Sequence, residues 1–248
     1  MRVDKVPLLI GILFALFSTN KINAQSFTVI NAGISGNTTL DVLQRLNRDV
    51  IAPKPDLVIL MIGTNDLLNT KKSMSYHDFE NKLNEIVNLL GMRNIKMLLV
   101  SPPPVDEYYL YKRHDKNKFF QKPNTLLMRA SQFMNSLARN EQIRFCDVYT
   151  LFSKREIPKH NQDLYIRNKK NSNAEDGVHP TSLGYQLIAE AIFNHLNSDD
   201  WLLSDSKILC LGDSITYGKY MIGQGTTKGN TYPAFLQRLF DQKIINSQ

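Results

Sequence analysis

The sequence predicts an α/β domain in which a parallel sheet is sandwiched between helices. Short apolar runs of strand length alternate with longer segments whose apolar residues recur at helical spacing. Strands joined in this way pair in parallel through right-handed crossovers, which place helices on the faces of the sheet. The length of 248 residues and the hydrophobic content of 42% suit a single globular domain. We assign that domain to residues 25–248.

Five apolar runs are predicted to be strands. The run at 57–62 is apolar throughout, as expected for a strand buried on both faces. Three consecutive prolines follow the run at 95–100 and end it, because proline cannot continue a central ladder. The predicted strands span residues 27–30, 57–62, 95–100, 143–148 and 208–211.

Helices are predicted between these strands and after the last one. In the segment 77–90 the apolar residues share one face, and Gly91 ends it. Thr181 or Ser182 is available to cap the segment 183–196. The predicted helices span residues 39–46, 77–90, 124–140, 183–196 and 232–240.

Two segments carry no clear period. Residues 105–123 interleave tyrosines and phenylalanines with lysines and arginines, which indicates either a long surface loop or a wall of a substrate site. Residues 149–175 are polar and are predicted to be irregular.

The amino end has the pattern of a secretory signal peptide, residues 1–24. Arg2 and Lys5 precede the apolar run 6–17, and Ala24 offers a small residue for cleavage. Twelve apolar residues are too few to span a bilayer. We therefore expect a secreted or periplasmic protein whose mature chain has no integral membrane segment.

Charge and cysteine content point away from several other classes of protein. The net charge of +7 is spread over the chain with no basic arm or nucleic-acid motif, so no nucleic-acid partner is expected. Cys146 and Cys210 both fall in predicted strands and have the pattern of small core residues. Neither has a metal-ligand partner at useful spacing, so neither a metal nor another cofactor is expected.

Four polar motifs follow apolar runs or end irregular segments. In open α/β sheets, ligands bind beyond the carboxyl ends of the strands, so three of these motifs are expected on one rim. The motifs are Asn31-Ala32-Gly33-Ile34-Ser35-Gly36, Gly63-Thr64-Asn65-Asp66, Asp176-Gly177-Val178-His179-Pro180 and Gly212-Asp213-Ser214.

Together these motifs resemble the four conserved blocks of the SGNH (GDSL-type) serine hydrolases, and the resemblance covers nearly all of the chain after the leader. It implies a three-layer α/β/α fold with a five-stranded, flavodoxin-like sheet in which the serine strand is central. In that family the serine block comes first, whereas here it comes last. The order therefore resembles a circular permutation, in which residues 197–206 link what are ordinarily the two termini.

The motifs contain the groups of a serine esterase. A serine such as Ser214 needs a base, and the base needs an orienting acid. Asp176 and His179 are three residues apart, so one turn can join them; the other four histidines have no such partner pattern. The resemblance assigns the oxyanion hole to the backbone N–H groups of Ser214 and Gly36 and the side-chain amide of Asn65. Singly, the glycines would suit a turn and Asn65 a helix cap.

The favoured function is a monomeric, secreted serine esterase that removes acetyl or other short acyl groups from carbohydrate or small-molecule esters. One alternative is lipase or lysophospholipase activity on lipid esters. Another is a non-catalytic carbohydrate-binding module on the same scaffold. The block order also fits a fragment of a tandem protein, whose central strand would have to come from a neighbour.

Overall fold

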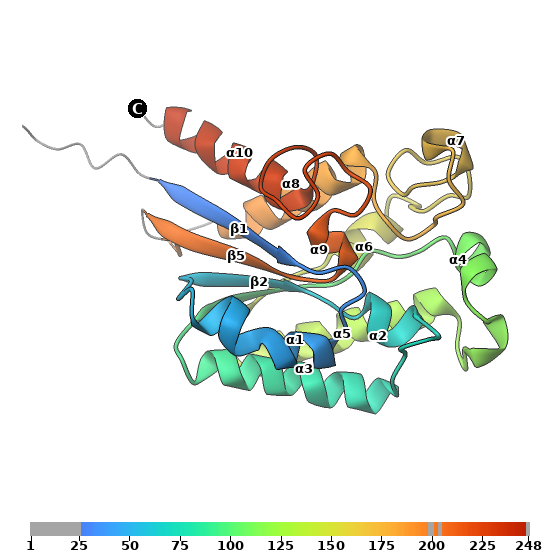
Figure 1. Cartoon of the computed structure of the whole chain (residues 1–248), viewed down its shortest axis with the longest axis horizontal. Coiled ribbons are helices and arrows are strands. Elements are labelled where there is room, and N and C mark those ends of the chain that lie inside the picture. Colours follow the sequence, from blue (N-terminus) through green and yellow to red (C-terminus); the bar gives the residue numbers. More distant parts are fainter. Residues whose placement is uncertain (1–25, 198–200, 203–204, 247–248) are drawn as a thin grey trace, which may run out of the picture.

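A computed structural model describes residues 26–197, 201–202 and 205–246 (Figure 1). The predicted signal peptide, residues 1–24, lies outside the described residues, as does part of the predicted linker 197–206. Within the described ranges, no helix combines the length and apolar character that crossing a membrane requires.

The sheet has five parallel strands in the order β1-β5-β2-β3-β4. The strands are β1 (Phe27–Gly33), β2 (Leu57–Met61), β3 (Lys96–Val100), β4 (Arg144–Cys146) and β5 (Ser206–Gly212). This confirms the predicted five-stranded, flavodoxin-like fold class. Although β5 is the last strand in sequence, it lies inside the sheet and pairs with β1 on one side and β2 on the other.

The register brings three strands to an end at one level. Gly212 of β5 is opposite both Gly33 of β1 and Met61 of β2. The residues that follow these strands therefore meet at one edge of the sheet, because parallel strands share a direction. A side chain on Gly212 would clash, since its Cβ would lie 2.2 Å from the carbonyl oxygen of Met61.

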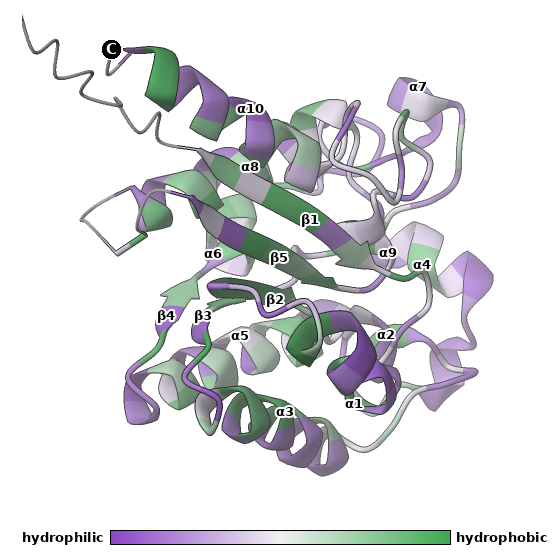
Figure 2. Ribbon diagram, turned by 60° about the vertical axis from the view of Figure 1, so that its left-hand side comes forward, coloured by the Kyte–Doolittle hydropathy of each residue, from purple (hydrophilic) through white to green (hydrophobic). Residues whose placement is uncertain are grey.

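Helices cover both faces of the sheet, which gives the three predicted layers (Figures 1 and 2). One core joins the sheet to α1 (Thr39–Leu46), α3 (Tyr76–Gly91) and α5 (Pro123–Asn140). The other core joins the opposite face to α6 (Val148–Ser153), α8 (Ser182–Leu196) and α10 (Tyr232–Asn246). Alternate residues of β2 enter the two cores, so the strand is apolar at every position, as the sequence indicated.

Side-chain caps define where several helices begin. Thr38 accepts a hydrogen bond from the Asp41 N–H, and the Asp41 carboxylate accepts one from the Thr38 N–H, which is a capping box for α1. Thr181 caps α8 by accepting from the Gly184 N–H, so of the two predicted candidates the threonine is the cap. Each such cap stabilises its helix by about 1 kcal/mol.

Of the two interpretations of residues 105–123, a continuous surface loop was wrong in part, whereas Leu110, Arg113 and His114 line the cavity at Ser214, which supports a wall of the site. This segment contains α4 (Glu107–Arg113) and a 3₁₀ turn, Lys116–Lys118. Asp106 caps α4, and burial of Tyr109 and Leu110 holds the helix against the domain. A seven-residue helix spans only about two turns, too few for a sustained apolar repeat in sequence, and its stability comes from tertiary packing.

The segment 149–175 also has more regular structure than expected. It includes most of α6, which Asp147 caps, and the single turn α7 (Lys169–Ser172), which Asn168 caps. The predicted fourth strand is correspondingly shorter, because residues 144–146 alone pair with β3. The last helix runs on to Asn246 instead of ending at residue 240.

Cys146 and Cys210 are buried free thiols in β4 and β5, as their predicted core role requires. Burial raises the pKa of each thiol to about 12. Both are therefore held as neutral, unreactive thiols at physiological pH.

Candidate active site

Ser214 is the first residue after the turn that ends β5. It opens the short helix α9 (Ser214–Tyr217), and the Asp213 side chain caps this helix by accepting from the Ile215 N–H at 2.8 Å. This sharp strand-to-helix turn presents the serine hydroxyl at the carboxyl edge of the sheet. Burial raises the pKa of Asp213 to about 7, and the charge of nearby Asp66 acts in the same direction.

His179 connects the serine with a carboxylate. Its Nε2 lies 3.0 Å from Ser214 Oγ, and its Nδ1 lies 3.0 and 2.9 Å from the two carboxylate oxygens of Asp176. With the ring proton on Nδ1, Nε2 has a free lone pair directed at the serine hydroxyl. The arrangement can move a proton from the serine to the imidazole while the carboxylate stabilises the resulting cation.

Local hydrogen bonds set the position of Asp176. Its Oδ1 accepts from the backbone N–H groups of Val178 and His179, each at 3.0 Å, so the turn 176–179 places acid and base together. Burial opposes ionisation of Asp176, but hydrogen bonds from His179 and the charge of Arg113, 3.7 Å away, outweigh it. The pKa of Asp176 is therefore held well below its ordinary value, and the group is an anion at neutral pH.

Among the backbone N–H groups at this edge, those of Ser214 and Gly36 have no acceptor in the described part of the chain. Gly36 has φ +82°, a left-handed conformation that favours glycine. Both residues line the cavity at the serine. Free N–H donors facing such a cavity can bind a developing oxyanion.

The amide of Asn65 is more constrained than the sequence suggested. Asn65 lies in α2 (Thr64–Leu68), directly after β2, and it lines the same cavity. Its Nδ2 donates to the carbonyl of Asn37 at 3.1 Å and to Asp213 Oδ2 at 3.3 Å. Because an amide nitrogen has two hydrogens, both are engaged within the protein, and one must turn from its present acceptor to reach an oxyanion.

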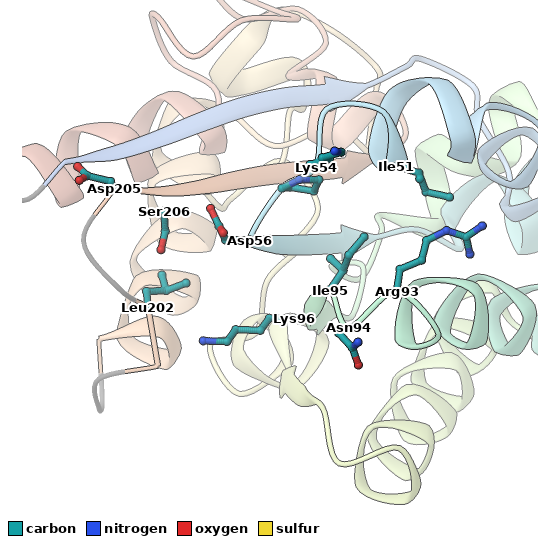
Figure 3. Close-up of a pocket in the computed structure, with 11 residues that line it drawn as sticks. Ile51, Lys54, Asp56, Arg93, Asn94, Ile95, Lys96, Leu202, Asp205 and Ser206 are labelled. Carbon is teal, nitrogen blue, oxygen red and sulfur yellow. The ribbon is translucent and has the colours of Figure 1, made fainter.

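The cavity at Ser214 is small, with a volume of about 180 Å³. Its polar lining includes side chains that sequence reasoning did not single out: Arg113, His114 and Lys219. A larger cavity of about 680 Å³ lies at the amino edge of the sheet, lined by residues 54–56, residues 93–96, Leu202 and residues 205–206 (Figure 3). None of the described residues that line it is a histidine, so it offers no base of the kind that Ser214 has.

Tyr220 was also missed by sequence reasoning. Its ring meets the His179 ring edge-on at 5.2 Å, with Arg167 4.8 Å and Lys219 5.0 Å from its centroid. Tyr220 has φ +71°, which is uncommon for a residue with a side chain and indicates local strain near the site. No local sequence signal marks this position, because the contact depends on the path of the loop after α9.

His160 has no partner pattern in the sequence, but the structure gives it an acidic partner. Its Nδ1 lies 2.7 Å from Asp106 Oδ2, although the two residues are 54 positions apart. Contacts at such separation have no spacing signature. Within the described residues, no group of three or more His, Cys, Asp or Glu is placed to hold a metal ion.

Comparison with known proteins gives consistent results. A model of the GDSL-like lipase/acylhydrolase family matches residues 18–187, a range that includes Gly36, Asn65, Asp176 and His179 but not Ser214. An acetylxylan esterase of Geobacillus stearothermophilus is 26% identical over 208 residues, which are 80% of this chain and 83% of that protein.

Solved structures show the same fold. The structure of an acetylxylan esterase from G. stearothermophilus has a TM-score of 0.53 and 23% identity, covering 69% of this chain and 73% of that one. A lipase/acylhydrolase from Enterococcus faecalis has a TM-score of 0.51 and 20% identity, covering 68% of this chain and 93% of that one.

Proposed function

The chain belongs to the GDSL-like lipase/acylhydrolase family and is a carboxylic ester hydrolase; from this premise we propose that it removes acetyl groups from carbohydrate with Ser214, His179 and Asp176 as a catalytic triad. The observation that carries the proposal is the pair of contacts made by His179, with Nε2 3.0 Å from Ser214 Oγ and Nδ1 on Asp176. The base is thus within hydrogen-bond reach of both the nucleophile and the orienting acid.

In the first half of the reaction, His179 Nε2 takes the proton of Ser214 as Oγ attacks the ester carbonyl carbon. The tetrahedral intermediate collapses when the sugar oxygen leaves with the proton from Nε2, and an acetyl-serine remains. In the second half, Nε2 takes a proton from water, the hydroxide attacks the acetyl group, and acetate leaves as Oγ recovers its proton. Asp176 stays ionised and stabilises the imidazolium in both halves.

The oxyanion is bound by the N–H groups of Ser214 and Gly36, with the Asn65 amide as a third donor. The two backbone donors are free in the structure, which supports their role. Asn65 joins them when one of its hydrogens leaves Asn37 O or Asp213 Oδ2. Loss of one such donor typically slows turnover about 10²- to 10³-fold.

The size of the cavity supports a short acyl group. Sites for drug-sized ligands occupy about 300–1,000 Å³, whereas the cavity at Ser214 has about 180 Å³ and a mainly polar lining. An acetyl group fits such a space and a long acyl chain does not. The similarity to an acetylxylan esterase over 80% of the chain supports carbohydrate as the alcohol.

A specific observation favours a second candidate, hydrolysis of longer acyl esters. A cavity of about 540 Å³ lies on the far side of α2, lined by apolar side chains such as Leu67, Met74 and Phe119. Opening of the wall between the two cavities would admit an acyl chain. A series of aryl esters of rising chain length separates the candidates: the acetyl proposal requires kcat/KM to fall steeply beyond about four carbons.

The decisive test of the triad is Ser214→Ala, assayed on acetylated xylo-oligosaccharide and on an aryl acetate. We expect a folded protein, by circular dichroism and thermal melting, whose kcat is at least about 10⁴-fold lower on both substrates. A folded Ser214→Ala variant with undiminished activity would remove the serine mechanism.

We further propose that the block order is a working permutation. Three observations support it: β5 lies between β1 and β2, the strand order is flavodoxin-like, and the family match ends before Ser214. The test is a chain in which residues 205–246 precede residues 26–197 through a short flexible linker. It is expected to fold and to hydrolyse aryl acetate at a rate within a few-fold of the natural order; an unfolded product would contradict the proposal.

We also propose that residues 1–24 are a cleaved signal peptide, as their charged, apolar and small-residue order indicates. Protein recovered from the periplasm or the medium should begin at Gln25 by N-terminal sequencing. A cell-associated product that retains Met1 would contradict export by this route.

A further inference from the structure

The cavity at Ser214 is positively charged. Arg113 and Lys219 line it together with His114, and no aspartate or glutamate is among the described residues that do so. A neutral acetylated sugar makes no use of such charge. Recognition of a neutral ester therefore does not explain why Arg113 and Lys219 line the cavity.

Arg113 and Lys219 differ in whether an acidic side chain of the protein lies near them. Arg113 lies 3.7 Å from Asp176 Oδ1, a distance that allows charge attraction but no short hydrogen bond. Lys219 has no acidic side chain within ion-pair distance in the described part of the chain; its contact is the Tyr220 ring, 5.0 Å from Nζ. Lys219 is thus a cation at the serine that has no internal counter-ion.

The surroundings reinforce the positive field. Burial is the larger cause that lowers the pKa of His114, and the nearby positive charges of Arg113 and Lys71 lower it further, so His114 is neutral at pH 7 and adds no charge of its own. Neighbouring lysines that do have acidic partners lie outside the cavity lining: Lys72 pairs with Asp41 at 3.6 Å and Lys112 with Glu175 at 2.9 Å. Asp41 and Glu175 therefore pair with lysines outside the cavity lining and do not neutralise Lys219.

Tyr220 fixes where that charge lies. The cationic groups of Lys219 and Arg167 lie over its ring. The same ring makes a T-shaped contact with the ring of His179. Lys219 is also tied to the nucleophile through its backbone, because its N–H donates to the carbonyl of Ser214 at 3.0 Å. Because Lys219 and Ser214 line the same cavity, one substrate can present an anion to Lys219 and an ester to Ser214.

Resting on the proposed esterase function, we propose that the substrate is an acetylated sugar that itself carries a carboxylate, a uronic acid or its oligomer. Lys219 binds the carboxylate, and Arg113 adds to the attraction. Hydrolysis leaves the carboxylate untouched, so the cation acts on substrate binding and orientation, not on the bond that breaks. The positively charged side chains of the cavity favour an anionic carbohydrate.

The test compares two substrates that differ in one group, an O-acetylated methyl glucuronoside and the methyl glucoside acetylated at the same position. We expect kcat/KM about two- to fivefold higher for the glucuronoside at low ionic strength, mainly through KM, because partly exposed ion pairs have effects of this size. The preference should shrink in about 0.5 M salt, which screens the charges.

Substitutions of Lys219 test whether this residue causes the preference for the glucuronoside. Lys219→Gln should reduce the glucuronoside-to-glucoside ratio of kcat/KM to about one, and Lys219→Arg should retain most of it. Lys228→Gln is the matched control, since it removes one charge from an exposed lysine of the following loop that does not line the cavity. That control should leave the ratio as it is in the natural protein.

Each contrary result has a distinct meaning. Equal kcat/KM for both sugars, or a ratio unchanged in Lys219→Gln, overturns this inference and leaves the esterase proposal intact. Preferential hydrolysis of a lysophospholipid over both sugars would show that the cations bind a lipid phosphate, which overturns the carbohydrate assignment as well. Activity that survives Ser214→Ala overturns the proposed mechanism but not the charge preference.

Discussion

Asp176–His179 and Asp106–His160 are two Asp–His pairs of the described residues, and their comparison shows what distinguishes a candidate catalytic base. Both pairs join a nearly buried carboxylate to Nδ1 of an imidazole, at 2.9 and 2.7 Å respectively. The side chain of His179 is 7% exposed, whereas that of His160 is 43% exposed. Opposite Nε2, His179 faces the Ser214 hydroxyl and His160 faces the Asn161 amide.

The second pair supports the first. The Asp106 N–H donates to the carbonyl of Gly177 at 2.7 Å, and Asp106 also caps α4. Gly177 has no room for a side chain, because its Cβ would lie 2.9 Å from the Asp106 carbonyl oxygen. Asp106–His160 therefore packs against the turn that holds Asp176 and His179. An Asp–His contact indicates catalysis when a nucleophile completes it and otherwise joins segments of the fold.

The largest difference between the pairs is expected on removal of the imidazoles. His179→Ala should lower kcat on aryl acetate by at least about 10⁴-fold, because Ser214 loses its base. His160→Ala should lower it by less than about tenfold and act on stability instead, measured by urea unfolding. Comparable losses of kcat in two folded variants would mean that His160 takes part in the reaction.

The carboxylates should differ in the same direction but less strongly. Asp176→Asn is expected to reduce kcat by about 10²- to 10⁴-fold, less than His179→Ala, since the ring keeps contacts that partly orient it. Asp106→Asn keeps the size of the side chain and should cost no more than a few-fold. A loss in Asp176→Asn equal to that in Ser214→Ala would show that the negative charge is indispensable.

Lowering the pH should reduce the free energy of unfolding, because Asp176 then loses the charge that His179 stabilises. The folded-state pKa of Asp176 is depressed, so its contribution is fully present above the unfolded-state pKa of about 3.9 and is lost as pH falls below it. The free energy of unfolding should therefore drop on acidification from about pH 5 to pH 2, by on the order of 2 kcal/mol from this group. Asp176→Asn should lack that part of the slope in urea titrations; parallel pH curves would contradict the depressed pKa.

The smallest effect is expected from Tyr109→Phe. The Tyr109 hydroxyl donates to Asn161 Oδ1 at 2.8 Å, beside His160. Its loss should cost about 1 kcal/mol of unfolding free energy and change kcat/KM by less than about twofold. Tyr149→Phe is the control, since its hydroxyl makes a similar bond to the Asn124 carbonyl at 2.9 Å. A large kinetic effect of Tyr109→Phe alone would show that the second pair tunes the first.

Much of this arrangement could be predicted because it depends on short-range pattern. The apolar run of β2 and the one-sided face of α3 follow from strand and helix periods. Asp176 and His179 are three residues apart, so a single turn brings them together, and Ser214 follows a strand that is buried on both faces. Each of these features is encoded within about ten residues.

Sequence reasoning failed where the contact partners are distant in the chain. Helix α4 was missed because its stability depends on burial of Tyr109 and Leu110 against other segments, and its own sequence does not show that burial. The partner of His160 was missed because 54 residues separate it from Asp106.

By itself, the sequence determined the strands, the main helices and the residues available for ester hydrolysis. The family resemblance implied a central serine strand, and the tertiary structure places β5 between β1 and β2 and brings Ser214 within 3.0 Å of His179. Only the tertiary structure decided that Lys219 lines the cavity and that the amide of Asn65 is engaged. The physical reason is that periodicity and spacing describe a chain's local conformation, whereas burial, charge and side-chain direction at a site depend on packing between segments far apart in sequence.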